Sequence, residues 1–356
     1  MRRQLPDLVL LAAFILAIAL PLASPLPPLA QFREQSGAPQ MDSSARQLAK
    51  TIIDFPNTFT AYFESHHLLH QQLVDLSQKI RFYLFHETVF PNVLIGKEDW
   101  LYYTGEDNIA DYECAMPFTA DELQLMRARL QGWHDQLAQR GIRFYVVIAP
   151  NKEAINPQYL PAYIQSRGKA CRIDQVMEEL ETTQLAVLDL RSPMQNAARS
   201  DQVYHRTDTH WNAVGALLAA REILGMVKQD FPQTTLPSYS DYLQENLPFS
   251  GDLAAFLPKN SRFIEQAPFL TSLAAPRARL EEGAGRSILS TISGIPLPGA
   301  LVFRDSFSDA LIPFLSEHFS RALFVHSFSV DLDLVDREKP DLVIFELAQR
   351  YLTVLR

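Results

Sequence analysis

Three polar residues in the second half of the chain have the types and spacing that nucleophilic catalysis requires. Asp208 and His210 stand two positions apart in YHRTDTHWNAVG (residues 204–215), and Ser306 stands in VFRDSFSDAL (residues 302–311). In an extended segment, residues i and i+2 point to the same side, so the Asp208 carboxylate can orient the His210 ring and stabilise its protonated form. The other ring nitrogen would then face Ser306. The pattern predicts a Ser-His-Asp triad.

Each half of this pattern also has a structural interpretation. Ser306 or Ser308 can cap a helix that begins beside them, and Asp208 or Asn212 can cap the helix that begins at WNAVGALLAAREIL. His210 would then be a solvated turn residue. Two such motifs, both at predicted strand-to-helix junctions, favour the catalytic interpretation. We therefore assign the cap to Asn212 and expect Trp211 to pack the turn.

Five apolar segments, interleaved with helix-like segments, must form the sheet that positions these residues. The predicted strands are 144–150, 185–190, 300–307, 321–328 and 341–347, and the predicted helices are 119–140, 173–181, 213–228 and 309–319. A capping box at Thr119 and Glu122 opens the first helix, and Gly141 ends it. This alternation predicts a three-layer α/β/α fold with a mostly parallel central sheet. Ser306 then stands at the carboxyl end of a strand, where such folds bind ligands.

The N-terminal segment carries a signal for export. Arg2 and Arg3 precede an apolar run, residues 8–23, whose length lies between that of a signal peptide and that of a membrane-spanning helix. The arginines predict that the N-terminus stays in the cytoplasm while the rest of the chain is translocated. Because small residues are poorly placed for cleavage, we favour an uncleaved signal anchor, residues 1–30, over a cleaved signal peptide.

The rest of the chain divides into a spacer and one large domain. Residues 31–54 form the Pro-rich and polar spacer. Residues 55–356 form the domain, which begins with predicted helices at 55–90. Within the domain, residues 231–298 are Pro-rich and lack periodicity, so we interpret them as long loops over the edge of the sheet.

Charge and cysteine content narrow the possible functions. The formal net charge of −9 argues against a nucleic-acid partner. In an exported protein, Cys114 and Cys171 can form one disulfide, although two free buried thiols are the alternative. Their spacing does not predict a zinc site, and His66 and His70, four residues apart, have no evident third ligand. We expect neither a metal nor a cofactor.

Five segments occur in the order found in one known family. They are IGKEDWLYY (95–103), APNKEAINPQYLP (149–161), YHRTDTHWNAVGA (204–216), LVFRDSFSDALIPFLSEHF (301–319) and PDLVIFELAQRYL (340–352). Over residues 55–353 the chain resembles the alginate O-acetyltransferase family (AlgJ- and AlgX-like), exported proteins with an SGNH-hydrolase-like domain. The resemblance implies that Asp208 and His210 are the Asp-x-His pair and that Ser306 is the nucleophile. It also implies that a membrane-bound O-acyltransferase partner supplies the acetyl group and that a secreted polysaccharide accepts it.

Four further residues near predicted strand ends are candidates for substrate binding: Arg304, Asn151, Lys152 and Arg350. The APNK segment begins at a strand end and can line the same cleft as the triad. Glu346 stands four residues before Arg350. A structural ion pair between these two is the default interpretation, and binding of an anionic sugar by Arg350 is the alternative.

We therefore predict a periplasmic O-acetyltransferase, held at the inner membrane by its anchor, that acetylates an alginate-like polysaccharide through an acetyl-serine intermediate. Two alternatives stay open: a carbohydrate acetylesterase with the same triad, and a non-catalytic scaffold of an exopolysaccharide secretion complex. The esterase differs only in accepting water. The triad requires the Ser306 hydroxyl to lie within about 2.6–3.2 Å of the His210 ring.

Overall fold

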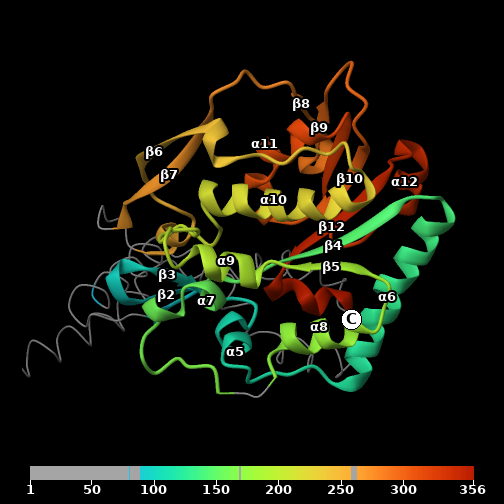
Figure 1. Ribbon diagram of the computed structural model, residues 1–356. Coiled ribbons are helices and arrows are strands. Elements are labelled where there is room, and N and C mark those ends of the chain that lie inside the picture. Colours follow the sequence, from blue (N-terminus) through green and yellow to red (C-terminus); the bar gives the residue numbers. More distant parts are fainter. Residues whose placement is uncertain (1–79, 81–88, 168–169, 258–262) are drawn as a thin grey trace, which may run out of the picture. The chain divides into compact units, whose positions relative to one another are not determined.

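The computed structural model describes residues 80, 89–167, 170–257 and 263–356 (Figure 1). The chain divides into two compact units, Met1–His86 and Glu87–Arg356, and the fold that follows is that of the second unit. No helix in the described part of the chain is long and apolar enough to cross a membrane.

Several sequence predictions fall outside these residues. The residues that the structure does not describe include the predicted signal anchor at 1–30, the spacer at 31–54 and nearly all of the helical segment at 55–90. His66 and His70 are also among them. These features stay predictions, except that residues 89–90, predicted as the end of the helical segment, form a strand.

A seven-stranded mixed sheet forms the middle layer of the second unit, with strand order β5-β4-β12-β10-β11-β9-β8 (Figure 1). Its strands are β4 (Arg143–Ala149), β5 (Ala186–Asp189), β8 (Arg279–Glu282), β9 (Ile288–Thr291), β10 (Gly299–Arg304), β11 (Arg321–His326) and β12 (Leu342–Ala348). The five strands predicted from sequence are all present and run parallel to one another. β9 and β8 extend the sheet beyond β11 in antiparallel orientation. The sheet is therefore mixed: most of its strands are parallel, as predicted, and the two antiparallel strands were not predicted.

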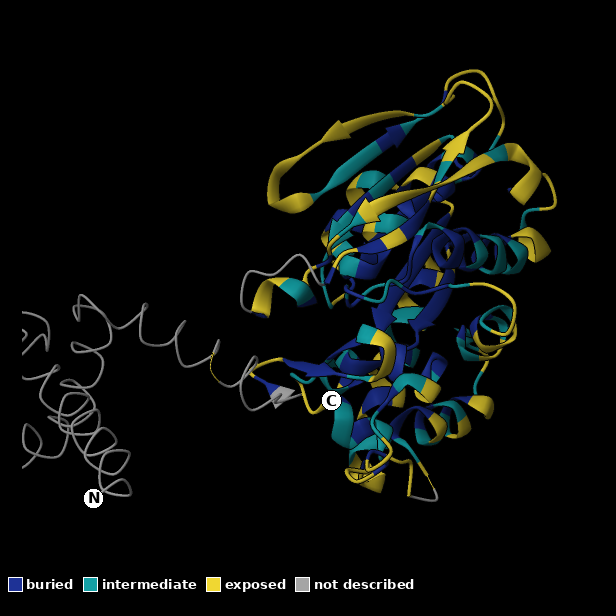
Figure 2. Cartoon of the chain, turned by 90° about the vertical axis from the view of Figure 1, so that its left-hand side faces the viewer, coloured by how far each residue is buried: buried dark blue, intermediate teal, exposed yellow. Residues whose placement is uncertain are grey.

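Successive side chains of a strand point to opposite sides of the sheet. In the central strands the side chains on both sides are buried. In β4, Phe144, Val146 and Ile148 belong to one core cluster. Tyr145 and Val147 belong to the cluster on the other face. In Figure 2 these strands form the dark-blue centre of the molecule.

Helices cover both faces of the sheet. The cluster around Phe144 also contains residues of α6 (Ala120–Gln139), α8 (Arg172–Glu181) and α12 (Leu332–Glu338). The cluster around Tyr145 contains residues of α9 (Arg191–Ala197), α10 (Ala213–Asp230) and α11 (Ile312–Leu315). The three-layer α/β/α arrangement is thus confirmed.

The ends of α6 follow the sequence signals. The Thr119 hydroxyl accepts the Glu122 N–H at 3.3 Å, and the Glu122 carboxylate accepts the Thr119 N–H at 2.8 Å. Gly141, with φ of 73°, follows the last turn in a left-handed conformation.

The predicted helix at 309–319 is wrong, because Pro313 cannot donate the hydrogen bond that a continuous α-helix needs. That segment forms η7 (Ser306–Ala310), α11 and η8 (Ser316–His318).

The segment 231–298, predicted as loops, contains four strands. β6 (Tyr242–Phe249) pairs antiparallel with β7 (Glu265–Ser272), and β8 and β9 join the main sheet. β6 is exposed at most positions, so it lacks the alternation of apolar and polar residues that reveals a strand in a sequence.

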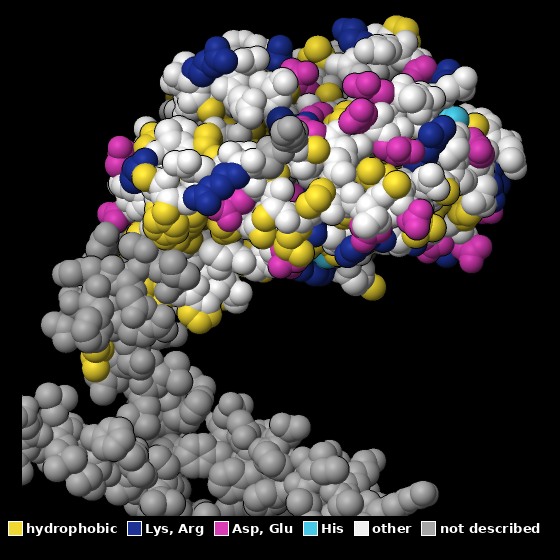
Figure 3. All heavy atoms as spheres, turned by 90° about the horizontal axis from the view of Figure 1, so that it is seen from below, with side chains coloured by type: hydrophobic (Ala, Val, Ile, Leu, Met, Phe, Trp, Pro, Cys, Tyr) yellow, Lys and Arg dark blue, Asp and Glu magenta, His cyan; other side chains and the backbone are white. Residues whose placement is uncertain are grey.

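A small antiparallel sheet and several short helices complete the unit. The sheet consists of β1 (Val89–Phe90), β2 (Val93–Ile95) and β3 (Leu101–Tyr103). The short helices are α5 (Asn108–Tyr112), α7 (Lys152–Ile155), η1 (Lys97–Asp99), η2 (Pro157–Tyr159), η3 (Tyr239–Asp241), η4 (Leu253–Phe256), η6 (Ala284–Arg286) and η9 (Gln349–Leu355). On the face drawn in Figure 3, Lys and Arg side chains lie among Asp and Glu side chains rather than in one basic patch.

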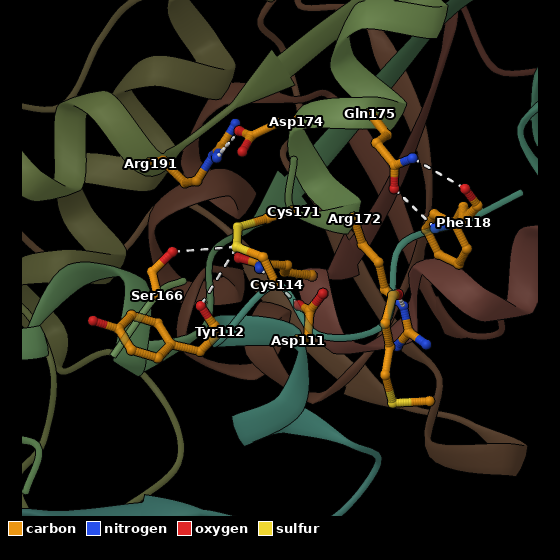
Figure 4. The surroundings of a disulfide bond; sticks show 12 residues. Asp111, Tyr112, Cys114, Phe118, Ser166, Cys171, Arg172, Asp174, Gln175 and Arg191 are labelled. Carbon is orange, nitrogen blue, oxygen red and sulfur yellow. Dashed lines mark hydrogen bonds and ion pairs between the residues drawn. A yellow bond between two sulfur atoms is a disulfide. The ribbon is translucent and has the colours of Figure 1, made fainter. Parts of the chain in front are cut away.

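A disulfide joins Cys114, just after α5, to Cys171, which directly precedes α8 (Figure 4). Of the two alternatives that the sequence left open, the structure has the disulfide and not two free thiols. The link connects two segments that are 57 residues apart.

Replacing Cys114 and Cys171 together with serine should lower the free energy of unfolding by about 4 kcal/mol, because a link over such a loop restricts the unfolded chain. Urea titration of both proteins, with and without reductant, measures the change. Reductant should lower the midpoint of the wild-type protein alone. Equal midpoints for all four samples would show that the link does not stabilise the fold.

Candidate active site

The carboxyl edge of the sheet brings Asp208, His210 and Ser306 together. His210 Nε2 lies 2.9 Å from Ser306 Oγ, and His210 Nδ1 lies 2.7 Å from Asp208 Oδ1. The distance to Ser306 falls within the range that the sequence analysis required. The three side chains form a continuous hydrogen-bonded chain in which the serine and the carboxylate use different nitrogens of one ring.

The loop that carries Asp208 and His210 is bent, whereas we predicted an extended segment. Tyr204 and Trp211 form an isolated antiparallel bridge that closes the loop. Asp208 Oδ1 accepts the His210 backbone N–H at 3.0 Å, in addition to its contact with the ring. The two side chains therefore lie on the same side because an Asp side chain closes a turn with the residue two positions on.

The residues that follow the loop have the structural roles predicted for them. Asn212 Oδ1 accepts the N–H groups of Val214 at 3.0 Å and Gly215 at 3.1 Å, which caps α10. Trp211 Nε1 donates to the carbonyl oxygen of Phe307 at 3.1 Å, and the two rings meet edge to face at 4.9 Å. Trp211 thereby connects the loop that carries Asp208 and His210 to the turn that carries Ser306.

The turn that carries Ser306 is capped by Asp305, so the serine hydroxyl is not needed as a cap. Asp305 Oδ1 accepts the Phe307 N–H at 2.8 Å, and Asp305 Oδ2 accepts the Ala348 N–H at 2.7 Å. The structural interpretation of Ser306 as a helix cap is therefore wrong.

A second buried carboxyl group, Glu346, lies behind the same turn. It accepts the Ser308 hydroxyl at 2.6 Å and the Asp305 N–H at 3.3 Å. Burial, reinforced by the nearby Asp305 carboxylate, raises the pKa of Glu346 well above its usual range. A neutral Glu346 can remain next to Asp305 without charge repulsion, and the pair holds the serine turn against β12.

The electrostatic surroundings of Asp208 keep it ionised. Burial acts to raise the pKa of this carboxyl, but hydrogen bonds from His210 and from the Asp252 backbone N–H, at 2.9 Å, outweigh burial and hold the pKa below its usual range. Gly251 makes the Asp252 contact possible, because a Cβ at this position would lie 2.4 Å from the Asp208 Cβ. The aspartate is thus prepared to stabilise a protonated His210.

Two carboxylates that were not predicted from the sequence also hold residues 204–211, a segment called the catalytic loop below because it carries the predicted catalytic residues Asp208 and His210. Asp252 accepts the N–H of Thr209 at 2.8 Å and its hydroxyl at 2.9 Å. Glu265 accepts the N–H groups of Arg206 at 2.9 Å and Thr207 at 2.8 Å. Both carboxylates come from the segment that we predicted as loops. The Gly-Asp dipeptide at 251–252 signals only a turn, and nothing in the sequence marks Glu265.

Asp208, His210 and Asp252 also form a group whose potential metal-ligand atoms lie within 4.8 Å of one another. Both Asp208 oxygens and both Asp252 oxygens already accept protein hydrogen bonds. The arrangement is therefore accounted for by the catalytic loop itself.

Lys152, predicted to bind substrate, lines the same cavity as Arg350 but directs its ammonium group at the backbone of the catalytic loop. The side chain is 3% exposed, and its ammonium group donates to the carbonyl oxygens of His205 at 3.0 Å, Arg206 at 3.4 Å and Asp208 at 2.5 Å. The ammonium also lies over two aromatic rings, 5.8 and 5.4 Å from their centroids. All of its N–H groups are thus directed at the loop backbone.

Two more candidates for substrate binding are also corrected. Asn151 is buried and donates to Asn108 Oδ1. Arg304 is buried, donates to the Asp305 carbonyl oxygen at 3.0 Å and pairs with Asp309 at 2.5 Å. Both side chains are buried and make their hydrogen bonds within the protein, although Asn151 Oδ1 and Arg304 Nε have no hydrogen-bond partner.

Arg350 remains as a candidate for substrate binding. The default interpretation, an ion pair with Glu346, is wrong, because Arg350 pairs with Glu106 instead. With Tyr103, Lys152 and Thr209, Arg350 borders a small cavity beside the catalytic loop, and in this structure the cavity is too narrow for a water molecule.

Replacing Lys152 with methionine should lower kcat by about 10- to 100-fold, because the loop that holds Asp208 loses its support.

Burial lowers the pKa of Lys152 to about 8. Wild-type activity should therefore fall as the pH rises through that value, since a neutral amine has two N–H donors instead of three. Between about pH 8 and 10.4, Lys152 is neutral in the folded protein but still protonated in the unfolded chain. The free energy of unfolding should therefore rise with pH over this range.

The opposite pH trends of activity and stability distinguish positioning by a buried cation from simple packing. Methionine keeps the apolar contacts with the aromatic rings, so both trends should vanish in Lys152→Met. Lys228→Met, at an exposed site near the end of α10, should keep both. Persistence of the alkaline loss of activity in Lys152→Met would assign that loss to another group.

Residues 93–326 match the model of a family described as the SGNH hydrolase-like domain of the acetyltransferase AlgX, and the match covers more than half of the chain. The chain belongs to this family. The family predicted from the sequence motifs is therefore confirmed. The AlgX family match includes Asp208, His210 and Ser306 within its bounds.

Individual relatives of the AlgX-family domain extend this finding. A probable alginate O-acetylase AlgJ of Pseudomonas syringae pv. tomato is 32% identical over 180 residues, which cover 50% of this chain and 44% of that protein. A probable alginate O-acetylase AlgJ of Azotobacter vinelandii is 26% identical over 281 residues, which cover 74% of this chain and 70% of that protein. The chain thus spans about half the length of the first relatives that it matches. The structure of Bacillus cereus PatB1 has the same fold, with a TM-score of 0.52 at 16% identity over 73% of this chain and 96% of that chain.

Proposed function

We propose that this protein is an O-acetyltransferase that uses Ser306 to move an acetyl group onto hydroxyl groups of an alginate-like polysaccharide. The observation that carries the proposal is the hydrogen-bonded chain from Asp208 through His210 to Ser306, with contacts of 2.7 and 2.9 Å. The relatives described as probable alginate O-acetylases supply the substrate class.

In the first half-reaction, Ser306 Oγ attacks the carbonyl carbon of an acetyl donor while His210 Nε2 takes the hydroxyl proton. The Asp208 carboxylate accepts the Nδ1–H and stabilises the imidazolium. When the tetrahedral intermediate collapses, His210 gives the proton to the leaving group and acetyl-Ser306 remains. The Phe307 N–H already donates to Asp305, so the N–H of Ser306 itself is our candidate to stabilise the oxyanion.

In the second half-reaction, a hydroxyl of the polysaccharide occupies the place of the leaving group. His210 takes the hydroxyl proton as the oxygen attacks the acetyl carbon. The bond to Ser306 Oγ then breaks, and His210 returns the proton to the serine. The polysaccharide leaves as an acetate ester, and the triad is restored. Water in place of the sugar hydroxyl would give the esterase reaction.

The setting we propose is the periplasm, with residues 1–30 as an uncleaved inner-membrane anchor and a membrane-bound O-acyltransferase as the acetyl donor. Support comes from the apolar run behind two arginines and from the Cys114–Cys171 disulfide, because disulfides persist in oxidising compartments.

The experiment that tests the proposal is incubation of the protein with an activated acetyl ester, with and without an oligouronate, followed by mass spectrometry. We expect one acetyl group on the peptide that contains Ser306, and acetylated oligosaccharide when the acceptor is present. Release of acetate at the same rate with and without the acceptor would indicate an esterase. If neither an adduct nor turnover is found, the protein is not an acetyltransferase, and a scaffold role replaces the proposal.

A further inference from the structure

Arg350 is a buried cation that the proposed reaction does not use. Its side chain is 5% exposed, and its guanidinium carbon lies 5.5, 5.1 and 5.0 Å from the ring centroids of Tyr103, Phe307 and Tyr351. Glu106 Oε2 lies 3.5 Å from Arg350 Nε, yet this buried nitrogen makes no hydrogen bond. A buried charge with incomplete pairing is costly. The Nε of Arg304 also makes no hydrogen bond, but of these two arginines only Arg350 lines the cavity beside Thr209.

The guanidinium borders the catalytic loop. It lines the same small cavity as Tyr103 and Thr209, and Thr209 is the residue between the catalytic aspartate and histidine. Phe307, whose ring contacts the guanidinium, directly follows Ser306 and meets the His210 ring edge to face at 4.8 Å. An anion held by Arg350 would therefore lie beside Thr209, in the loop that carries Asp208 and His210.

Glu106 is the counter-ion of Arg350, and two features of its position allow another anion to displace it. It lies on the loop between β3 and α5, where Glu106 and Asp107 have φ values of 54° and 57°. Residues other than glycine adopt this left-handed conformation at a cost in free energy. The Glu106 side chain is also 41% exposed, so its carboxylate can turn into water when another anion takes its place.

We propose that Arg350 binds the carboxylate of a uronate unit in the acceptor polysaccharide, and that Glu106 occupies this position in the free protein and is displaced by the substrate. The inference rests on the proposed function, because it takes a uronate polymer as the acceptor. A guanidinium offers two parallel N–H donors to a carboxylate, and the rings around Arg350 hold its plane fixed. Anchoring the carboxylate fixes which hydroxyl of the sugar reaches acetyl-Ser306.

The test compares two acceptors that differ only in charge: an oligouronate and the same oligosaccharide with its carboxylates reduced to alcohols. The measured quantity is the ratio of kcat/KM for the uronate to kcat/KM for the neutral acceptor, with an activated acetyl ester as donor. Arg350→Gln should lower this ratio by about 30- to 100-fold, and Arg350→Lys should lower it less because the charge remains. Glu106→Gln should raise the ratio several-fold, because a competing carboxylate is removed.

Arg172→Gln is the matched control. Arg172 is also buried, and its guanidinium lies 5.1 Å from the Phe118 ring, but it does not border the cavity. This variant should keep the wild-type ratio.

Because the side chain of Glu106 is half-exposed, Glu106→Gln tests the inference even if Arg350→Gln does not fold. An unchanged ratio in Glu106→Gln, or equal losses for both acceptors in Arg350→Gln, would overturn the inference and leave the acetyltransferase proposal standing. Failure of the wild-type protein to acetylate either acceptor would overturn both.

Discussion

Replacing Ser306 with alanine should reduce acetyl transfer by about 10⁴-fold or more, because the members of a triad act as a unit and none compensates for loss of the nucleophile. The acetylated peptide should also disappear from the mass spectrum after incubation with an activated ester. The rate of transfer to an oligouronate and the mass of the protein measure the two effects separately.

Ser327→Ala is a matched control for this variant. Ser327 follows β11, and its hydroxyl donates to the Ser329 carbonyl oxygen at 2.9 Å, whereas the His210 ring pairs with Ser306. The control should keep the wild-type rate and the acetyl adduct. Thermal unfolding of Ser306→Ala should match that of the wild-type protein, since Asp305 and not Ser306 caps the turn. Transfer at the wild-type rate by Ser306→Ala would show that another group carries the acetyl.

The part of the site that local sequence patterns encode could be predicted. The central strands are continuous apolar runs, and polar residues at their carboxyl ends gather at one edge of a parallel sheet. Ser306 follows β10 directly, and the Asp208–His210 pair is joined to its turn by Trp211. These relations hold within short segments or follow from strand order, so the sequence reveals them.

The supporting carboxylates could not be predicted, because their roles depend on distant partners. Asp252 bonds Thr209 across 43 residues, and Glu265 bonds Thr207 across 58. Both residues lie in or beside strands and turns with little apolar periodicity, and no local pattern connects them to the catalytic loop.

Two arginines near strand ends show why spacing alone does not assign a role. Arg304 ends β10 and turns inward to pair with Asp309, whereas Arg350 follows β12 and borders the cavity beside Thr209. The same residue type at a similar position braces the fold in one case and remains available to a ligand in the other. Only the packing of the surrounding rings and carboxylates separates them.

Replacing Asp208 with asparagine should lower kcat by about 10⁴-fold while leaving the fold intact, because the amide no longer holds the correct His210 tautomer or stabilises the imidazolium. The pKa of Asp208 is held below its usual range, so its ionised form stabilises the folded protein above the unfolded pKa of about 3.9. That contribution is lost as the pH falls through the lower, folded pKa. Asparagine does not titrate, so the wild-type advantage in free energy of unfolding should be largest near neutral pH and shrink in acid.

Asp252 supplies both the control for this variant and the outcome that would contradict it. Its Oδ2 lies 3.9 Å from His210 Nδ1, which makes it the carboxylate best placed to replace Asp208. Asp252→Asn should cost far less than Asp208→Asn, because the Asp252 backbone N–H that supports Asp208 remains. If Asp208→Asn lost less than about tenfold in kcat while the double variant lost about 10⁴-fold, either carboxylate would suffice to orient His210. The histidine loop would then contain two alternative orienting acids, and the proposed triad would describe only one of them.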